Sequence, residues 1–242
     1  MNWIKPDWPL PAHVHAAMTT RMGGVSQGHY ASLNPASHVN DDPAHVNLNR
    51  AIIRDSLNLP NEPLWLQQVH GVAVVKADSV SGIPEADASY TDQPGMVCAV
   101  LTADCLPVLV CGNGGEKLAA IHAGWRGLQA GIIQQTLSRM SCREVSVWLG
   151  TAIGPDHFEV GEEVRSAFVT HDSSTRAAFK EHGQDRWLAD IYKLARLQLH
   201  ALGIDQIYGG EGCTVSDSQR FYSYRRDGAA TGRMASLIWR DR

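Results

Sequence analysis

Three short segments each carry a side chain that can bind a metal or attack a substrate. They contain His70 in QQVHG, Cys105 in TADCLP and His122 in IHAGWRG. Each of these residues lies where an apolar, strand-like run stops, and each has a glycine or proline beside it that lets the backbone turn. Loops at strand ends commonly hold catalytic groups. We therefore predict that His70, Cys105 and His122 are catalytic.

Two imidazoles and one thiolate suit zinc, which prefers nitrogen and sulfur ligands in a tetrahedron. Three protein ligands leave a fourth position for water or substrate, as in catalytic rather than structural zinc sites. A metal at such a site lowers the pKa of bound water and supplies a nucleophile at neutral pH. Asp104, adjacent to Cys105, is the candidate for a base or for an acceptor that orients a ligand.

The same residues permit chemistry without a metal. Cys105 and His122 can form a nucleophile–base pair, as in a cysteine-dependent hydrolase or amidase acting on a peptide or a cell-wall precursor. A non-catalytic metal-binding or interaction protein is a third possibility. In the simplest structural interpretation, each histidine makes a hydrogen bond in a polar turn and Cys105 is a small buried side chain. Residue types and spacing do not choose among these alternatives.

The bulk composition excludes several classes of protein. The chain has 242 residues, 44% of them hydrophobic, which is enough to bury a sizeable core. A formal net charge of −4 gives no electrostatic reason to bind nucleic acid or an anionic membrane. The opening MNWIKPDWPLPAH lacks the basic and apolar regions of a signal peptide, and the longest apolar runs are too short to span a bilayer. The five cysteines are odd in number and include no C-x-x-C pair, which argues against a disulfide framework. We expect a cytoplasmic monomer or weak homodimer.

Local patterns predict the secondary structure. Apolar, β-branched runs bounded by turn signals predict strands at His13–Thr20, Leu64–Val69, Val72–Lys76, Val97–Thr102, Val108–Cys111, Leu118–Ala123, Val145–Leu149, Gln206–Tyr208 and Met234–Trp239. Helical spacing of apolar residues predicts helices at Pro43–Leu57, Leu128–Met140, Gly161–Thr170 and Leu188–Leu202. The first of these helices has a typical start, an acidic cap followed by proline.

Strands dominate the middle of the chain, and helices intervene without strict alternation. That arrangement favours an α/β (α+β) protein, with mixed β-sheets flanked by helices, over a doubly wound fold. A boundary near Gly150–Pro155 is conceivable, but the part that follows has too few strands to form an independent unit. We therefore predict a single catalytic domain, residues 1–242.

The three segments and many others along the chain closely resemble the YfiH-type family, whose members are labelled laccase-domain proteins, polyphenol oxidases or purine nucleoside phosphorylases. The further matching segments lie in the same order along nearly the whole chain: TTRMGGVS, SLN, NR, ADASYT, AIGPDHFEVGEEV and FYSYRRDGAATGRMASLIW. Two short stretches depart from the family pattern. Thr151 stands where proline is expected, and Asp156-His157 lies in a variable stretch. Both can alter the pocket wall.

The resemblance implies a fold similar to that of some cysteine-dependent deamidases, with zinc bound by His70, Cys105 and His122. It also implies phosphorolysis of adenosine, inosine, guanosine and S-methyl-5′-thioadenosine to the free base and ribose 1-phosphate, with deamination of adenosine as a companion reaction. Purine nucleosides and phosphate would then be the partners. In deamination, Asp104 is the nearest carboxylate for proton transfer.

Phosphorolysis needs an anion site, and arginine suits it because the guanidinium forks onto phosphate. Candidates for binding substrate or phosphate are the arginines in loop-like, glycine-flanked or aromatic contexts, namely Arg21, Arg126, Arg225 and Arg226. Each can instead be a surface residue or part of an ion pair. The aromatic residues Phe221, Tyr222 and Tyr224 can stack on a purine, although core packing is the commoner outcome beside a strand.

The laccase label has weaker support in the residues. Multicopper oxidation needs many histidines, typically in His-x-His pairs, and the chain has 11 histidines but one such pair, His13 and His15. On the predicted strand both would face the same side. Copper(II) can also replace zinc at the three-residue site, because it binds most such ligands more tightly. A copper-dependent polyphenol oxidase therefore stays an alternative.

Overall fold

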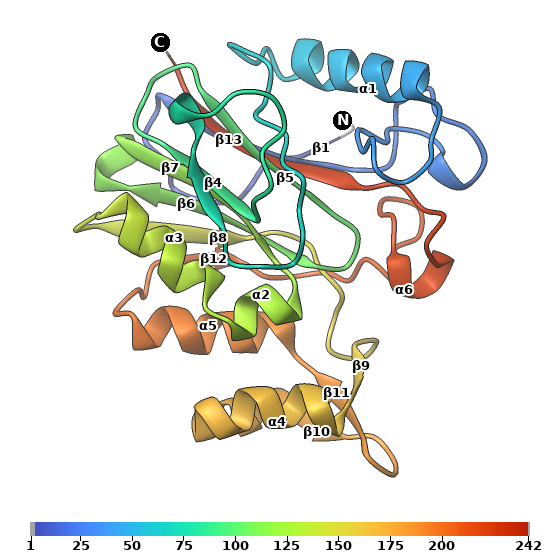
Figure 1. Ribbon diagram of the computed structural model, residues 1–242, viewed down its shortest axis with the longest axis vertical. Coiled ribbons are helices and arrows are strands. Elements are labelled where there is room, and N and C mark those ends of the chain that lie inside the picture. The colour runs from blue at the N-terminus through green and yellow to red at the C-terminus, as the bar shows by residue number, and fades with distance from the viewer. Residues whose placement is uncertain (1–2, 242) are drawn as a thin grey trace.

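The structure is a computed structural model that describes residues 3–241, and its backbone forms three β-sheets and a set of flanking helices (Figure 1). Mixed sheets flanked by helices confirm the predicted fold class. Residues 1, 2 and 242 of the expected domain lie outside the described residues.

The largest sheet has six strands, and it carries His122 and the residue that follows Cys105. Its spatial order is β12 (Ile207–Gly209), β8 (Val145–Leu149), β6 (Leu106–Gly112), β7 (Lys117–Ala123), β4 (Ala88–Thr91) and β3 (Val74–Lys76). Neighbouring strands are antiparallel except at the two edges, where β12 runs parallel to β8 and β3 runs parallel to β4.

Two smaller sheets accompany it. The four-stranded sheet is antiparallel, in the order β1 (Trp3–Ile4), β2 (Val14–Thr19), β13 (Met234–Arg240) and β5 (Val97–Thr102). The three-stranded sheet is also antiparallel, in the order β10 (Phe179–Glu181), β11 (Arg186–Ala189) and β9 (Glu159–Gly161). Figure 1 shows this third sheet beside α4, below the main body.

The α-helices are α1 (Pro43–Ser56), α2 (Trp125–Gln129), α3 (Ile132–Met140), α4 (Glu162–His171), α5 (Ile191–Ala201) and α6 (Tyr224–Asp227). Short 3₁₀ turns occupy Gly28–Tyr30, Ala77–Ser79, Asn113–Gly115 and Ser173–Ala178. Within residues 3–241, no helix is both long enough and apolar enough to cross a membrane.

Side chains alternate between the two faces of each central strand, so each strand packs against two layers. In β6, Val108 and Val110 face the cluster formed with α3 and α5, whereas Leu109 faces the four-stranded sheet. In β5, Val100 meets that same inter-sheet cluster, whereas Leu101 turns to the cluster beneath α1. Both faces of each strand are therefore buried, which explains why these segments read as continuous apolar runs. The layers follow the order α1, four-stranded sheet, six-stranded sheet, helices (Figure 1).

The helix predicted at Pro43 is confirmed, and its start has the expected cap. Asp42 accepts a hydrogen bond from the Ala44 amide at 2.8 Å, and Pro43 occupies the first helical turn. The helix predicted over Leu128–Met140 is instead two helices, α2 and α3. Gly131 separates them with a φ of 90°, a left-handed conformation that favours glycine.

Two other predictions were wrong in extent. Leu64–Val69 is not a strand, because it makes only isolated bridges from Leu64 to Cys98 and from Gln67 to Glu85. The helix predicted from Leu188 begins at Ile191, because the preceding residues pair with β9 and β10. Strands β1, β4, β9, β10 and β11 were not predicted. They are short, so their period-2 pattern is too brief to stand out.

A buried amide ties α1 to the loop that precedes it. The Asn49 side chain is fully buried and accepts a hydrogen bond from the Val25 amide at 2.9 Å. Its Nδ2 lies within 2.8 Å of Ser26 Oγ, 3.1 Å of the Ser32 carbonyl and 3.0 Å of the Asn34 carbonyl. One side chain thus satisfies several buried polar groups of a segment without regular structure.

Replacing Asn49 with alanine should therefore lower the free energy of unfolding by about 2–4 kcal/mol, because buried donors and acceptors lose their partners. Urea denaturation followed by circular dichroism measures the change. Asn47→Ala is the matched control, since Asn47 lies on the exposed side of the same helix. The control should stay within about 0.5 kcal/mol of the parent protein. Equal effects at the two positions would contradict this account of the network.

Candidate metal centre and cavity

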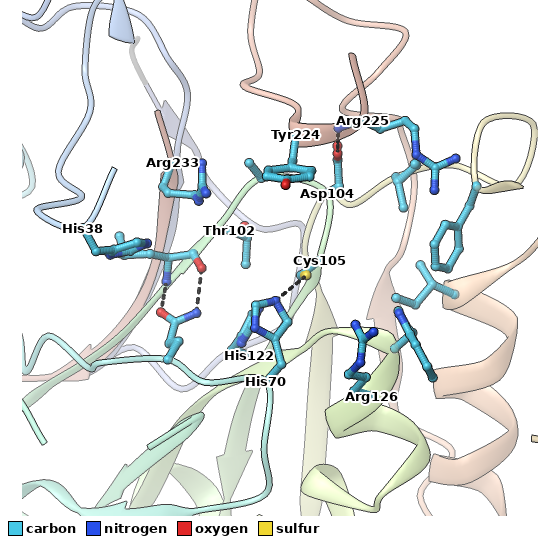
Figure 2. A pocket seen from close by; sticks show the side chains of 17 residues that line it. His38, His70, Thr102, Asp104, Cys105, His122, Arg126, Tyr224, Arg225 and Arg233 are labelled. Atoms are coloured by element: carbon cyan, nitrogen blue, oxygen red, sulfur yellow. Dashed lines mark hydrogen bonds between the residues drawn. The ribbon is translucent and has the colours of Figure 1, made fainter. Parts of the chain in front are cut away.

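His70, Cys105 and His122 converge at one end of the six-stranded sheet (Figure 2). His122 lies on β7, and Cys105 immediately precedes β6, whose first residue pairs with Ala123. The antiparallel pairing of β6 with β7 brings these two residues together. His70 comes from the loop before β3, where its φ of 61° turns the backbone.

The three donor atoms are close enough to share one ion. They all lie within 4.8 Å of one another, and Cys105 Sγ is 3.8 Å from His70 Nε2. The two imidazole rings meet edge to face, with centroids 4.8 Å apart. Among residues 3–241, this is the only group of three or more such side chains that converges in this way. Two nitrogens and one sulfur fit a zinc-type ion, so the group can hold a metal.

Asp87 is the positioning residue for this group, and the sequence analysis did not select it. Its carboxylate is fully buried and accepts a hydrogen bond from His122 Nδ1 at 2.8 Å, which leaves Nε2 for the site. The same carboxylate accepts the backbone amides of His70 at 2.9 Å and Gly71 at 2.7 Å. Burial alone would raise the pKa of Asp87, but these hydrogen bonds outweigh it and lower the pKa. One carboxylate therefore fixes two of the three ligands.

The charges at the centre support one another. Burial disfavours the Cys105 thiolate, but the charges and hydrogen bonds of His122 and His70 lower its pKa to about 6. Burial likewise disfavours a charged His122, but the Cys105 thiolate and Asp87 raise its pKa to about 9. Both shifts favour a thiolate beside an imidazolium in the metal-free centre. Binding a metal would then release the imidazolium proton.

Gly124 makes room for the ligands. A Cβ at this position would lie 3.0 Å from His70 Cδ2 and 3.1 Å from Cys105 Sγ. Both contacts are tighter than ordinary van der Waals distances, so a side chain here would press on two ligands at once. Gly124 therefore lets the backbone between β7 and α2 pass close to the centre.

The centre opens into a cavity of about 500 Å³, within the usual range for a small-molecule site. The residues that line it are His38, Gln68, His70, Leu101, Thr102, Ala103, Asp104, Cys105, His122, Trp125, Arg126, Ile153, Phe158, Ile191, Tyr224, Arg225 and Arg233. They come from loops at the end of the sheet, from the ends of β5 and β7, from the starts of α2 and α5, and from the segment around α6.

Asp104 lines the cavity, but its carboxylate binds the C-terminal segment. It accepts hydrogen bonds from Thr214 Oγ1 at 2.5 Å, Ser223 Oγ at 3.1 Å and the Arg225 amide at 2.6 Å. The residue has a φ of 84°, which turns the chain just before Cys105. Both carboxylate oxygens are thus engaged, and the acceptor that orients a histidine ligand is Asp87 instead.

The structure separates the four arginines selected from the sequence. Arg126 and Arg225 line the cavity, whereas Arg21 and Arg226 lie outside the set that lines it. Arg226 pairs with Asp227 at 2.7 Å and also donates to backbone carbonyls.

Arg21 donates to the carbonyls of Ala31 and Ser218, and it lies over the Tyr222 ring at 4.7 Å. Of the three aromatic candidates, Tyr224 lines the cavity, whereas Phe221 and Tyr222 are buried in the core.

The structure adds cavity residues that the sequence analysis did not select. Gln68 pairs its side-chain amide with the Leu101 backbone, accepting from the amide and donating to the carbonyl, both at 2.8 Å. His38 and Arg233 reach the cavity from segments that lie far apart in the sequence. Gln68 falls inside the matching segment QQVHG and Arg233 inside FYSYRRDGAATGRMASLIW, and membership of these segments was the available signal.

The His-x-His pair does not share a strand face. Strand β2 begins at Val14, so His13 precedes it. His15 stacks on Trp239 and hydrogen-bonds Asp241 through Nε2 at 2.9 Å. Neither residue belongs to the metal-competent group among residues 3–241. The five cysteines are all free.

The fold and the site define the class: a mixed α+β protein with a metal-competent His/Cys/His centre at the end of its main sheet. Residues 15–241 match the family model described as multi-copper polyphenol oxidoreductase laccase, and the chain belongs to this family. The resemblance to YfiH-type proteins is confirmed by curated relatives. The chain is 52% identical over 242 residues to "Purine nucleoside phosphorylase YfiH" of Escherichia coli, and the match covers 98% of each chain.

Other relatives agree with this assignment. "Purine nucleoside phosphorylase PA4543" of Pseudomonas aeruginosa is 51% identical over 240 residues, with 98% of each chain covered. The crystal structure of Neisseria meningitidis protein NMB0706 superposes with a TM-score of 0.96 at 49% identity, covering 100% of each chain. That of YlmD from Geobacillus stearothermophilus gives a TM-score of 0.90 at 30% identity, covering 100% of this chain and 97% of the other.

Substituting Asp87 with asparagine should weaken metal binding about 10- to 100-fold, because a positioning carboxylate of this kind usually contributes that much to affinity. Competition with a zinc chelator measures the dissociation constant. Asp205→Asn is the matched control, since Asp205 also pairs with a histidine, His200, at 3.0 Å but on the exposed surface. Unchanged zinc affinity in a folded Asp87→Asn protein would contradict the role assigned to Asp87.

Proposed function

We propose that the protein is a zinc-dependent purine nucleoside phosphorylase acting on adenosine, inosine, guanosine and S-methyl-5′-thioadenosine. The observation that carries the proposal is the convergence of His70, Cys105 and His122 on a cavity of about 500 Å³ that is also lined by arginines. Further support comes from relatives that are named purine nucleoside phosphorylases and are covered over nearly their whole length.

In the proposed reaction, a phosphate oxygen forms a bond to ribose C1′ while the bond from C1′ to the purine nitrogen breaks. The electron pair of that bond leaves with the purine, which takes up one proton, and the other product is ribose 1-phosphate. The protein therefore has to hold an anion beside C1′ and to stabilise the departing base. A zinc ion on His70, Cys105 and His122 would supply positive charge and an open coordination position.

The residues around the centre suit these tasks. Arg126 and Arg225 bring positive charge to the cavity, and Trp125, Phe158 and Tyr224 offer aromatic surface to a purine. Arg126 lies over the Trp125 ring at 4.4 Å, which holds its guanidinium at the cavity edge. Asp104, with its hydrogen bonds to Thr214, Ser223 and Arg225, is better suited to fix this wall than to move protons.

We extend the proposal to the deamination of adenosine at the same site. In that reaction the oxygen of a water molecule replaces the amino group, which leaves as ammonia. The support is the metal-competent donor set together with the resemblance of the surrounding segments to the YfiH-type family. Inosine formed from adenosine in phosphate-free buffer is the product that reports this activity.

A cysteine-dependent hydrolase is the second candidate, because the pKa of Cys105 is lowered to about 6 beside His122. Chelation and alkylation separate the two. A thiol hydrolase would lose activity on alkylation only, whereas a zinc phosphorylase would lose it on both treatments and recover from chelation when zinc is added. Copper-dependent polyphenol oxidation, as the family description suggests, predicts instead dioxygen uptake with a phenol after loading with copper.

The direct test is turnover of inosine, guanosine, adenosine and S-methyl-5′-thioadenosine by zinc-loaded protein, with and without phosphate. We expect free base and ribose 1-phosphate, resolved by chromatography, to appear only when phosphate is present. Cys105→Ala should reduce the rate at least about 100-fold, because the loss of a metal ligand removes the charge that the reaction needs. Cys142→Ala, at a partly buried cysteine outside the cavity, should keep the parent rate.

Metal content and thermal unfolding are measured on each variant, so that loss of fold is distinguished from loss of chemistry. If the zinc-loaded parent protein releases no base from any of the four nucleosides, or if Cys105→Ala is as active as the parent, the proposed function is rejected.

A further inference from the structure

Arg233 brings a guanidinium with unused donors to the cavity. It lies just before β13, is half-buried and lines the cavity wall. Its Nη1 donates to the carbonyls of its own turn, Thr231 at 2.8 Å and Gly232 at 3.0 Å. Over residues 3–241, no hydrogen bond engages its Nε or Nη2, and no carboxylate forms a salt bridge with it. The remaining N–H groups are therefore available to a ligand.

The other arginines near the cavity differ in this respect. Arg225 donates through both terminal nitrogens to the carbonyls of His157 at 3.1 Å and Glu159 at 2.9 Å. Arg126 is exposed and lies over the Trp125 ring. Among the arginines that line the cavity, Arg233 thus combines burial with free donors.

The backbone of Arg233 is held rigidly. Its amide donates to Asn34 Oδ1 at 3.0 Å, and the Asn34 side chain is fully buried. Asn34 Nδ2 in turn donates to Asp41 at 2.9 Å, and its carbonyl accepts from Asn49. The network that ties α1 to its loop therefore also fixes the residue that presents the guanidinium, which limits the ordering required when a ligand binds.

Arg233 keeps its charge although it is half-buried. Burial lowers the pKa of this guanidinium, while the nearby Cys105 and Asp104 favour its charged form. An arginine nevertheless stays protonated at neutral pH. A partly dehydrated cation without a carboxylate partner is stabilised when an anion supplies the missing contacts. His38 lies on the same side of the cavity as Arg233 (Figure 2).

The opposite side of the cavity has a different character. Figure 2 shows Arg126 and Arg225 across the cavity from Arg233 and His38. The Trp125 ring lies 4.4 Å from the Arg126 guanidinium, and the Phe158 ring lies 5.9 Å from that of Arg225, so the large aromatic surfaces gather on that side. The guanidinium with free donors therefore lies on one side of the cavity and the large aromatic surfaces lie on the other, with the metal-competent group between them.

We propose that Arg233 is the anchor of the phosphate subsite, with its Nε and Nη2 donating to two phosphate oxygens. Phosphate then occupies the side of the cavity next to His38, and the purine occupies the aromatic side near Trp125 and Phe158. The identity of the anion as phosphate rests on the proposed function, whereas the anion site itself rests on the unused donors of Arg233.

The test compares zinc-loaded parent protein with Arg233→Gln, Arg233→Lys and Arg139→Gln. Arg139 is the matched control because it is exposed on α3, away from the cavity, and its substitution removes the same charge. Calorimetry with inorganic phosphate measures binding, and steady-state kinetics give KM for phosphate and for inosine separately. Zinc content and thermal unfolding are measured on every variant.

We expect Arg233→Gln to weaken phosphate binding and raise its KM about 10- to 100-fold, because a two-point charged contact is lost. The KM for inosine should change less than about threefold, since the purine lies on the other side. Arg233→Lys keeps the charge but not the fork, so its phosphate affinity should fall between those of Arg233→Gln and the parent. It also provides the measurement if Arg233→Gln fails to fold.

Phosphate affinity in both Arg233 variants equal to that of the parent and of Arg139→Gln would overturn the proposal. So would an equal rise in KM for phosphate and inosine, because that indicates a general disturbance of the cavity. Phosphate binding that depends on Arg233 in a protein without phosphorolytic activity would support the anion site and reject the proposed function. Phosphorolysis that neither Arg233 variant changes would support the proposed function and reject the phosphate subsite at Arg233.

Discussion

The buried carboxylate of Asp87 is the constraint on which the centre depends. It orients His122 through Nδ1 and holds the turn at His70 through two backbone amides. A fully buried carboxylate is stable only when its oxygens are satisfied, and here the groups that satisfy it are the candidate ligand His122 and the backbone amides of His70 and Gly71. The site and the stability of this end of the sheet therefore depend on the same contacts. A structure that lost this geometry would also leave a buried charge without partners.

A second aspartate, Asp104, also positions part of the site through hydrogen bonds. Asp104 joins the turn before Cys105 to Thr214, Ser223 and the start of α6. The segment around α6 carries Tyr224 and Arg225 and leads to Arg233, so this contact brings the C-terminal part of the chain over the metal-competent group. Two acidic side chains thus shape the cavity through hydrogen bonds, Asp104 as part of its lining and Asp87 from outside it. Neither needs to touch a substrate for the site to have its shape.

The division of the cavity connects its geometry to the proposed chemistry. Phosphorolysis brings together an anion, a sugar and a flat heterocycle, and the cavity offers the free donors of Arg233, a metal-competent centre and an aromatic side in that spatial order. Loops supply most of these groups, while the strands beneath them are buried on both faces and hold the loop ends in place. Hydrogen bonds from α1 also support the cavity. Asn49 donates to the Asn34 carbonyl, and the Asn34 side chain accepts the Arg233 amide.

The sequence by itself determined the central strands, the start of α1 and the three candidate ligands. Continuous apolar runs such as Val97–Thr102 are local patterns, and the ligands lie in short segments that resemble a known family. Tertiary structure alone decided that Asp87 and Arg233 join the site, that Arg21 and Arg226 do not line it, and that Leu64–Val69 is not a strand. The physical reason is that a polar side chain acquires its role from its partners. Those partners are brought together by pairing between strands that are distant in the sequence, such as β4 with β7, and no local pattern encodes that contact.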